Sequence, residues 1–158
     1  MSFIIKGLDG RVFCHLYGLT DNELREKGAI RIHVDEYPCY PDRITLRDIP
    51  VGETGILLNH TYLDTDSPYR GSHAIFIWEG QSQRGVYRDT IPEVMQKRMM
   101  SLRGFDGRDM LIEATIAQPE EVREHILSLF KNDQVDFILA HNARQGCFSC
   151  RIERDLGS

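Results

Sequence analysis

Two cysteines near the carboxyl end of the chain form the most obvious chemical motif. Cys147 and Cys150 are separated by two residues, and a Cys-x-x-Cys pair can hold a metal ion or form a redox couple. The flanking residues alternate as in a β-strand, where positions three apart point to opposite faces. We therefore expect Cys150 to share the core face with Phe148 and Ile152, Cys147 to lie on the polar face, and the pair to bind no metal.

The segment before Cys147 carries groups that can activate a thiol. His141, Arg144 and Cys147 fall within seven residues of one another. An imidazole and a guanidinium close to a thiol favour its nucleophilic thiolate form. Cys147 and His141 are therefore the candidate catalytic pair. The alternative is a half-buried thiol at the end of a hairpin, with His141 bonding only to loop carbonyls.

A second polar segment, Asp66–His73, joins two predicted strands. A guanidinium such as that of Arg70 can receive a carboxylate or phosphate through its planar fork. We expect this segment to meet the His141 loop in a recess, where Arg70 and Arg144 bind an anionic group that Tyr69 and Asn142 orient. The alternative is ordinary turn chemistry, in which Arg70 pairs with a structural acid.

The elements that would position these groups are short in the first half of the chain. Thr20 and Glu23 have the spacing of a capping box, which predicts a helix that Gly28 closes. Short apolar segments then predict strands. These segments are Ile30–Val34, Ile44–Leu46, Ile56–His60 and Ala74–Trp78. Because Ala74–Trp78 is apolar at every position, we expect it to be a central strand covered on both faces.

The second half of the chain predicts a longer helix between two strands. Pro119–Lys131 starts with proline and carries one apolar stripe, and the strand-like segments Met110–Ala117 and Val135–Ala140 flank it. This order favours a crossover between parallel strands. The segment Cys147–Glu153 follows after a short loop, which favours an antiparallel hairpin. A further helix is expected at Pro92–Met100.

These elements predict an α+β fold with a mixed, mostly antiparallel sheet and two or three helices, including one strand-helix-strand crossover near the carboxyl end. A length of 158 residues suits a single domain spanning residues 1–158. With 41% hydrophobic and 27% charged residues, the composition is that of a globular protein and excludes collagen-like, coiled-coil and disordered classes.

Charge and cysteine content restrict the partners and the compartment. The chain has 19 Lys and Arg against 24 Asp and Glu, and a net charge of −5 gives no general electrostatic reason to bind nucleic acid or anionic membranes. No apolar run approaches the roughly 20 residues that span a bilayer. Four cysteines are too few for a disulfide scaffold, and the first residues do not resemble a signal peptide, so we expect the cytoplasm.

Several segments taken together resemble the bacterial domain-of-unknown-function family 1203, from about residue 30 onward. These segments are Tyr37–Cys39, Ile49–Glu53, Ser67–Arg70, Ile75–Ile77, Ser101–Asp106 and His141–Phe148. The resemblance implies a small single-domain bacterial protein and no established activity, substrate or cofactor. Tyr40 stands where the family pattern often has arginine, so the resemblance implies no anion contact from that loop.

Two functional hypotheses from different classes follow. The first is binding of a small anion or small metabolite at a polar recess, with or without a Cys/His-based activity. The second is a non-catalytic protein-interaction module, for which Trp78, Phe105 and the Met99–Met100 pair are the natural apolar anchors. The sequence does not decide whether the protein is an enzyme, and it indicates no cofactor, ligand identity or oligomeric state.

Overall fold

The computed structural model describes residues 1–157 and contains nine strands, three α-helices and three 3₁₀ turns. The strands are β1 Phe3–Lys6, β2 Ile30–His33, β3 Thr54–Leu63, β4 Gly71–Trp78, β5 Val86–Arg88, β6 Met100–Phe105, β7 Leu111–Ala117, β8 Phe137–Asn142 and β9 Phe148–Arg154. The helices are α1 Asp21–Glu26, α2 Glu93–Gln96 and α3 Val122–Phe130, and the 3₁₀ turns are η1 Gly10–Val12, η2 Cys14–Leu16 and η3 Pro119–Glu121.

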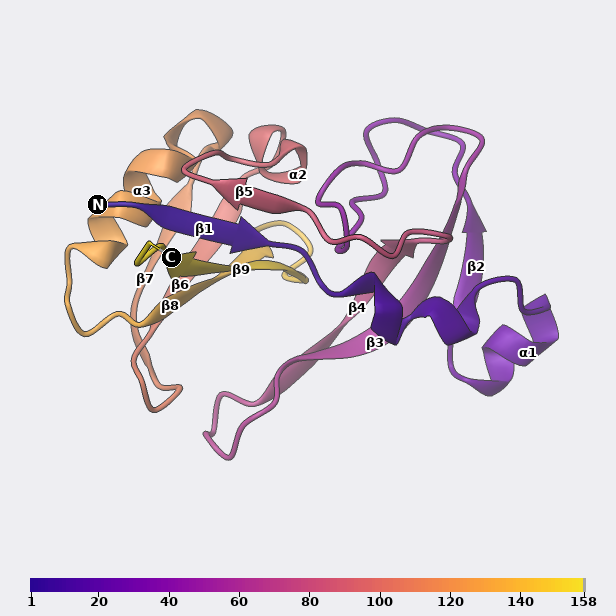
Figure 1. Cartoon of the computed structure of the whole chain (residues 1–158), viewed down its shortest axis with the longest axis horizontal. Helices are drawn as coiled ribbons and strands as arrows, with labels where there is room; N and C mark the ends of the chain where they lie inside the picture. The colour runs from indigo at the N-terminus through magenta and orange to yellow at the C-terminus, as the bar shows by residue number, and fades with distance from the viewer. Residues whose placement is uncertain (158) are drawn as a thin grey trace.

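The strands form two sheets, which lie beside each other in Figure 1. The larger sheet has the order β5-β1-β9-β8-β6-β7, and the smaller has the order β2-β3-β4. Neighbouring strands within each sheet pair antiparallel. The predicted α+β class, with mostly antiparallel strands and two or three helices, is confirmed, although the strands divide between two sheets.

Helix α3 and the strands on either side of it form the predicted crossover. Strand β6 lies between β7 and β8 and pairs antiparallel with both, so β7 and β8 run parallel to each other. The predicted helix Pro119–Lys131 is present as η3 followed by α3. Its apolar stripe, which includes Ile126 and Phe130, is buried against the large sheet. Burial of such side chains stabilises by roughly 1.5–3 kcal/mol each.

Three hydrophobic clusters divide the molecule into layers. The largest lies between the large sheet and the helices α2 and α3, and includes Cys150 and Ile152. A second, around Phe105, Phe137 and Phe148, covers the other face of that sheet and meets Leu63 of β3. The third packs α1 and the η1–η2 segment against the small sheet. The small sheet therefore lies against the face of the large sheet that α3 leaves open (Figure 1).

Four local predictions were wrong or incomplete. Ile44–Leu46 is a tight loop, because the Asp42 carboxylate accepts hydrogen bonds from the Ile44 and Thr45 backbone N–H groups and caps a turn. Ala74–Trp78 belongs to β4, which is an edge strand of the small sheet, and only residues 42 and 43 pair along its outer side. The helix expected at Pro92–Met100 is the single turn α2, and Met100 begins β6. Strands β1, β5 and β6 were not predicted.

The amino-terminal helix was predicted correctly. The Thr20 side chain accepts from the Glu23 backbone N–H, and the Glu23 carboxylate accepts from the Thr20 backbone N–H, which completes the capping box around α1. Within residues 1–157, the helices are all too short and too polar to cross a bilayer.

Candidate functional site

A buried arginine in the β2–β3 connection joins the two sheets. The side chain of Arg43 is among the largest fully buried ones, at 2% exposure. Its backbone N–H donates to the Phe76 carbonyl of β4 at 3.2 Å, and its Nε donates to the Phe148 carbonyl of β9 at 2.9 Å. Its two remaining nitrogens donate to the Pro41 carbonyl at 2.7 Å and to Cys147 Sγ at 3.1 Å. Arg43 therefore fixes Cys147 at the junction of the sheets.

The Arg43 guanidinium has no carboxylate partner within ion-pair distance among the residues that the structure describes. The neighbouring Asp42 carboxylate accepts instead from backbone N–H groups, including that of Trp78, and from the Thr45 hydroxyl. Burial lowers the pKa of Arg43, which still stays protonated because its ordinary value is so high. A buried unpaired cation is costly. Of the acceptors of Arg43, the sulfur of Cys147 is the group that can become an anion.

Asn142 completes the surroundings of Cys147. Its Nδ2 lies 3.4 Å from the Cys147 sulfur, and its Oδ1 is buried without a hydrogen-bond partner. Cys147 itself is only half-buried, because it lines a small cavity of about 80 Å³ between the sheets. Cys39, Arg43, Arg98 and Asn142 line the same cavity.

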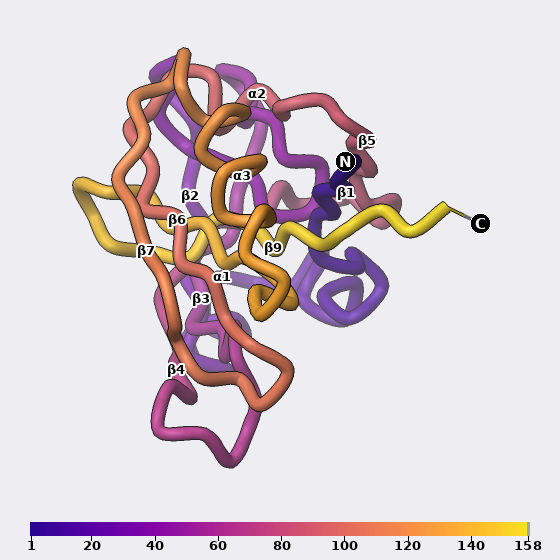
Figure 2. Tube along the Cα trace, turned by 90° about the vertical axis from the view of Figure 1, so that its left-hand side faces the viewer, coloured from indigo at the N-terminus to yellow at the C-terminus, as the bar shows by residue number. Residues whose placement is uncertain are grey.

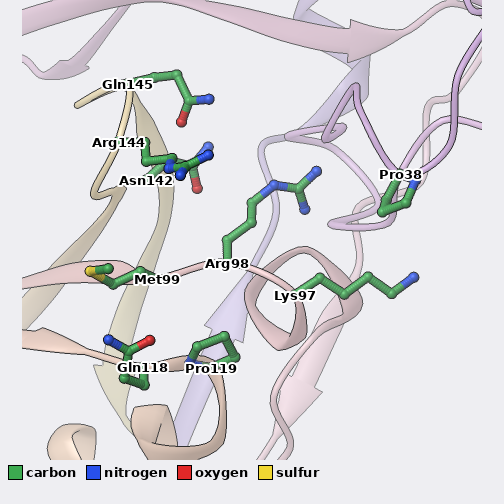
Figure 3. Close-up of a pocket in the computed structure, with 9 residues that line it drawn as sticks. All are labelled: Pro38, Lys97, Arg98, Met99, Gln118, Pro119, Asn142, Arg144 and Gln145. Carbon is green, nitrogen blue, oxygen red and sulfur yellow. The ribbon is translucent and has the colours of Figure 1, made fainter.

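A larger recess of about 410 Å³ adjoins this cavity and shares Arg98, Asn142 and Gln145 with it. Figure 3 shows the polar ends of Arg98, Arg144 and Gln145 pointing into the space between the β8–β9 loop and α2. The lining of the recess holds three cations and three carboxamides but no carboxylate. Its residues are Pro38, Lys97, Arg98, Met99, Gln118, Pro119, Asn142, Arg144 and Gln145.

Two of the three cations have acidic partners behind the recess. Arg98 pairs with the fully buried Asp48 through both terminal nitrogens, at 3.2 and 2.5 Å. Lys97 lies 3.5 Å from the Glu93 carboxylate and 4.6 Å from the Tyr37 ring centroid. Arg144 is exposed at the tip of the β8–β9 loop. Gly146, with a φ of 77°, allows the chain to reverse there, because this conformation is unfavourable for residues with a side chain.

His141 lies six residues before Cys147, near the end of β8, and its ring packs into an aromatic cluster. The His141 ring is fully buried and packs against Tyr62, His73 and Phe148. Its Nδ1 donates to the Gly146 carbonyl at 2.9 Å, since a carbonyl can only accept, and its Nε2 is buried without a partner. Burial lowers the pKa of His141 to about 4, so the ring is neutral at pH 7.

Tyr69 and Arg70 are not part of this recess, and the two segments meet only through His73, whose Nδ1 accepts from the Phe148 backbone N–H at 3.1 Å and whose ring centroid lies 5.2 Å from that of His141. The Tyr69 ring packs on Phe105, with ring centroids 5.8 Å apart, and Arg70 makes an exposed ion pair with Asp64 at 3.2 Å. Phe105 ends β6, whereas Met100, which pairs with Asn142, begins it. Five residues of strand separate these positions, or about 17 Å. Figure 2 shows the tip of the β3–β4 hairpin far below the β8–β9 loop.

Cys150 lies in the hydrophobic cluster under α3 with Ile152, whereas Cys147 lines the small cavity, and the prediction that Phe148 shares the face of Cys150 was wrong. Cys150 is buried in the cluster under α3, where burial raises the pKa of its thiol to about 12. A β-bulge between the pairs Ala140–Cys150 and His141–Phe148 shifts the alternation, so Phe148 packs on the opposite face. Within residues 1–157, no three His, Cys, Asp or Glu side chains are arranged to hold a metal ion.

The family model described as "Protein of unknown function (DUF1203)" matches residues 39–154, which is most of the chain. The chain belongs to this family. The match begins at Cys39 and includes Arg43, Arg98 and the whole β8–β9 hairpin, so the recess and the small cavity lie almost entirely within the family region. No curated protein and no solved structure matches the chain.

Sequence reasoning found three residues of the site and missed others. Asn142, Arg144 and Cys147 lie together around the recess and the cavity, because one short loop carries them. Arg43, Arg98 and Cys39 come from distant segments and had not been assigned to a site. Of the apolar anchors considered for an interaction module, Phe105 and Met100 are buried in the core.

Proposed function

We propose that this protein binds a small organic anion in the recess between α2 and the β8–β9 loop, with Cys147 at the inner end of the site. The observation that carries this proposal is the lining of three cations and three carboxamides without a carboxylate, in a chain whose net charge is −5. Because Arg98 and Lys97 are paired with Asp48 and Glu93, the charge of Arg144 is the one that attracts small anions to the site. A recess of about 410 Å³ has the size of sites for small molecules.

Arg144 is the residue that we propose to contact the anionic group first. Its side chain is exposed at the recess, whereas Arg98 and Lys97 already have carboxylate partners. A free guanidinium fork recognises a carboxylate or a phosphate through two parallel hydrogen bonds. The carboxamides of Gln118 and Gln145 also line the recess and can donate to and accept from a hydroxyl or amino group of a ligand. This combination favours hydroxy or amino carboxylates and their phosphorylated relatives.

Within this proposal Cys147 is the reactive group and His141 is a positioning residue. A neutral ring that donates to the Gly146 carbonyl holds the loop that carries Arg144 and Cys147. Tyr69 and Arg70 have no role in the proposed site, because they lie about 17 Å away along β6. We also propose the cytoplasm as the compartment, since all four cysteines are free thiols, and a single domain for the chain.

Calorimetric titration with a panel of small carboxylates and phosphate esters tests the binding proposal. Arg144→Ala is expected to weaken binding of the best anion by about tenfold or more, because one charge-assisted contact is worth roughly 1.5–3 kcal/mol. Arg70→Ala is the matched control, since it removes an exposed arginine that lies far from the recess. Equal affinities for both variants and the unaltered protein, or no binding of any anion in the panel, would contradict the proposal.

A further inference from the structure

Two thiols line the same small cavity, and their surroundings differ. The Cys147 sulfur accepts a hydrogen bond from the buried Arg43 guanidinium and lies close to the Asn142 amide. Cys39 is an exposed residue of the β2–β3 connection, and partial desolvation and the nearby Glu36 and Asp35 carboxylates raise the pKa of its thiol. One thiol therefore has a cation at its sulfur, and the other stays protonated.

The charge of Arg43, which has no carboxylate partner among the described residues, is directed at the Cys147 sulfur. Removing a guanidinium from water is expensive unless an anion compensates it, and the other two acceptors of Arg43 are neutral backbone carbonyls. The Cys147 sulfur, 3.1 Å from Nη2 of Arg43, is the acceptor of that guanidinium at which negative charge would be stabilised during a reaction. The charged and titratable side chains that line the cavity with Cys147 are Arg43, Arg98 and Cys39, and the first two favour a negative sulfur.

A second observation is an unsatisfied polar atom in a residue that lines the cavity. The Oδ1 atom of Asn142 is buried there without a partner, in a residue that is only 4% exposed. Buried polar atoms of this kind are nearly always satisfied by the protein, by water or by a ligand. The cavity volume of about 80 Å³ exceeds the roughly 30 Å³ share of one water molecule but is too small for a metabolite.

We propose that Cys147, with the Arg43 guanidinium at its sulfur, reacts with a hydroperoxide in this cavity, and that Cys39 then closes a disulfide with it. In the first step the Cys147 sulfur attacks one peroxide oxygen, an S–O bond forms and the O–O bond breaks. The sulfur is oxidised to a sulfenic acid, and the leaving oxygen takes a proton and departs as water or an alcohol. In the second step the Cys39 sulfur attacks the sulfenic sulfur, the S–O bond breaks, and the hydroxyl leaves as water with the Cys39 proton.

This chemistry goes beyond the binding of anions in the outer recess. The hydroperoxide is the oxidant, and the disulfide is the product that an external thiol reductant would restore to two thiols. A bridge from residue 39 to residue 147 would tie the β2–β3 connection to the β8–β9 loop across the inner cavity. Oxidation can be measured without any anion present, so its outcome is independent of the binding experiment.

The test is oxidation of the fully reduced protein by hydrogen peroxide, followed by peptide mapping without reductant. Cys147 is expected to react at least about tenfold faster than the exposed Cys14 of the same molecule, because a thiolate is the reacting form. The expected product is a disulfide between Cys39 and Cys147. In Cys39→Ser, a sulfenic acid at Cys147 is expected to accumulate and to be trapped by dimedone, whereas the matched control Cys14→Ser should behave as the unaltered protein.

The role of Arg43 is tested in the same assay. Arg43→Met is expected to slow the oxidation of Cys147 by about tenfold or more, and Arg43→Lys to retain most of the rate. Because Arg43 is buried, circular dichroism must first show that each variant folds, and the comparison of Cys147 with Cys14 needs no variant. Oxidation of Cys147 no faster than that of Cys14 would overturn the proposal. So would a stable sulfenic acid in the unaltered protein, or a disulfide that joins Cys147 to any cysteine other than Cys39.

Discussion

Three arginines in this protein have different electrostatic environments, although all are at least partly buried. Arg31 pairs with Glu79 on the small sheet, and Arg98 pairs with the buried Asp48 beside the recess. Arg43, in contrast, is bonded to two carbonyls and a sulfur. The carboxylates of Glu79 and Asp48 neutralise the charges of Arg31 and Arg98. The positive charge of Arg43 has no such partner and remains available to a reactive group or a ligand.

At the residue scale, His141 makes stability depend on pH. Burial lowers its pKa from 6.5 to about 4, so the unfolded chain binds more protons between these values, and stability falls as the pH decreases through that window. The expected loss from His141 is about 2 kcal/mol between pH 7 and pH 5. Burial also lowers the pKa of His60 and His73, which act in the same direction.

Urea unfolding at pH 7 and pH 5 measures this contribution. His141→Gln should lose less stability than the unaltered protein on acidification, while the exposed His33→Gln should lose the same amount. An unchanged pH dependence in His141→Gln would show that the ring does not titrate as a buried base.

At the element scale, the sequence predicted those helices whose first residues form a capping box or include an N-terminal proline. The helix at Asp21–Glu26 followed from the spacing of Thr20 and Glu23, and the α3 region followed from Pro119 and its apolar stripe. Strands β1 and β5 are only four and three residues long, too short for a clear alternation. The bulge at Ser149 was unpredictable for another reason, since it depends on pairing with β8 and not on the sequence of β9.

The capping box of α1 gives a prediction at this scale. Thr20→Ala removes the side-chain acceptor of the Glu23 backbone N–H and is expected to destabilise the protein by about 1 kcal/mol. Thr20→Ser keeps a hydroxyl at the same position and should cause no loss of stability, because serine is at least as favourable as threonine at an N-cap. Denaturant midpoints of the two variants measure the difference, and equal midpoints would mean that α1 is held by docking of Leu24 alone.

At the scale of the whole molecule, the contact between the two sheets decides both the fold and the site. The residues of the β8–β9 loop were predictable because they are close in the chain, and a short hairpin keeps them together. Arg43 and Cys39 join them only through packing of the small sheet on the large one, and no local pattern encodes that arrangement. The same packing separates the two hairpin tips that were expected to meet, because β3 and β4 extend past the end of β6 remote from the recess.

A substitution at Gly7 tests the contact between the sheets. Gly7 follows the end of β1, where the chain passes from the large sheet to the small one. A Cβ atom at Gly7 would lie 1.9 Å from the Ile44 carbonyl oxygen, which belongs to rigid backbone next to Arg43. Gly7→Ala is therefore expected to destabilise the protein by at least about 2 kcal/mol. Gly107→Ala is the matched control, because open space surrounds that position and no such loss is expected. Thermal unfolding of both variants compares them, and similar midpoints would contradict the tight contact at Gly7.

The ends of the chain lie together, since the Asp155 backbone N–H donates to the Ser2 carbonyl at 2.9 Å. They meet at the end of β9 opposite to Phe148, about 20 Å along the strand from the loop that carries Arg144. A short linker could thus connect the regions of Ser2 and Asp155, and new ends could be opened at the exposed β6–β7 turn without altering the recess that Arg144 lines. Circularly permuted or immobilised forms of the protein would then leave the recess that Arg144 lines open to ligands in solution.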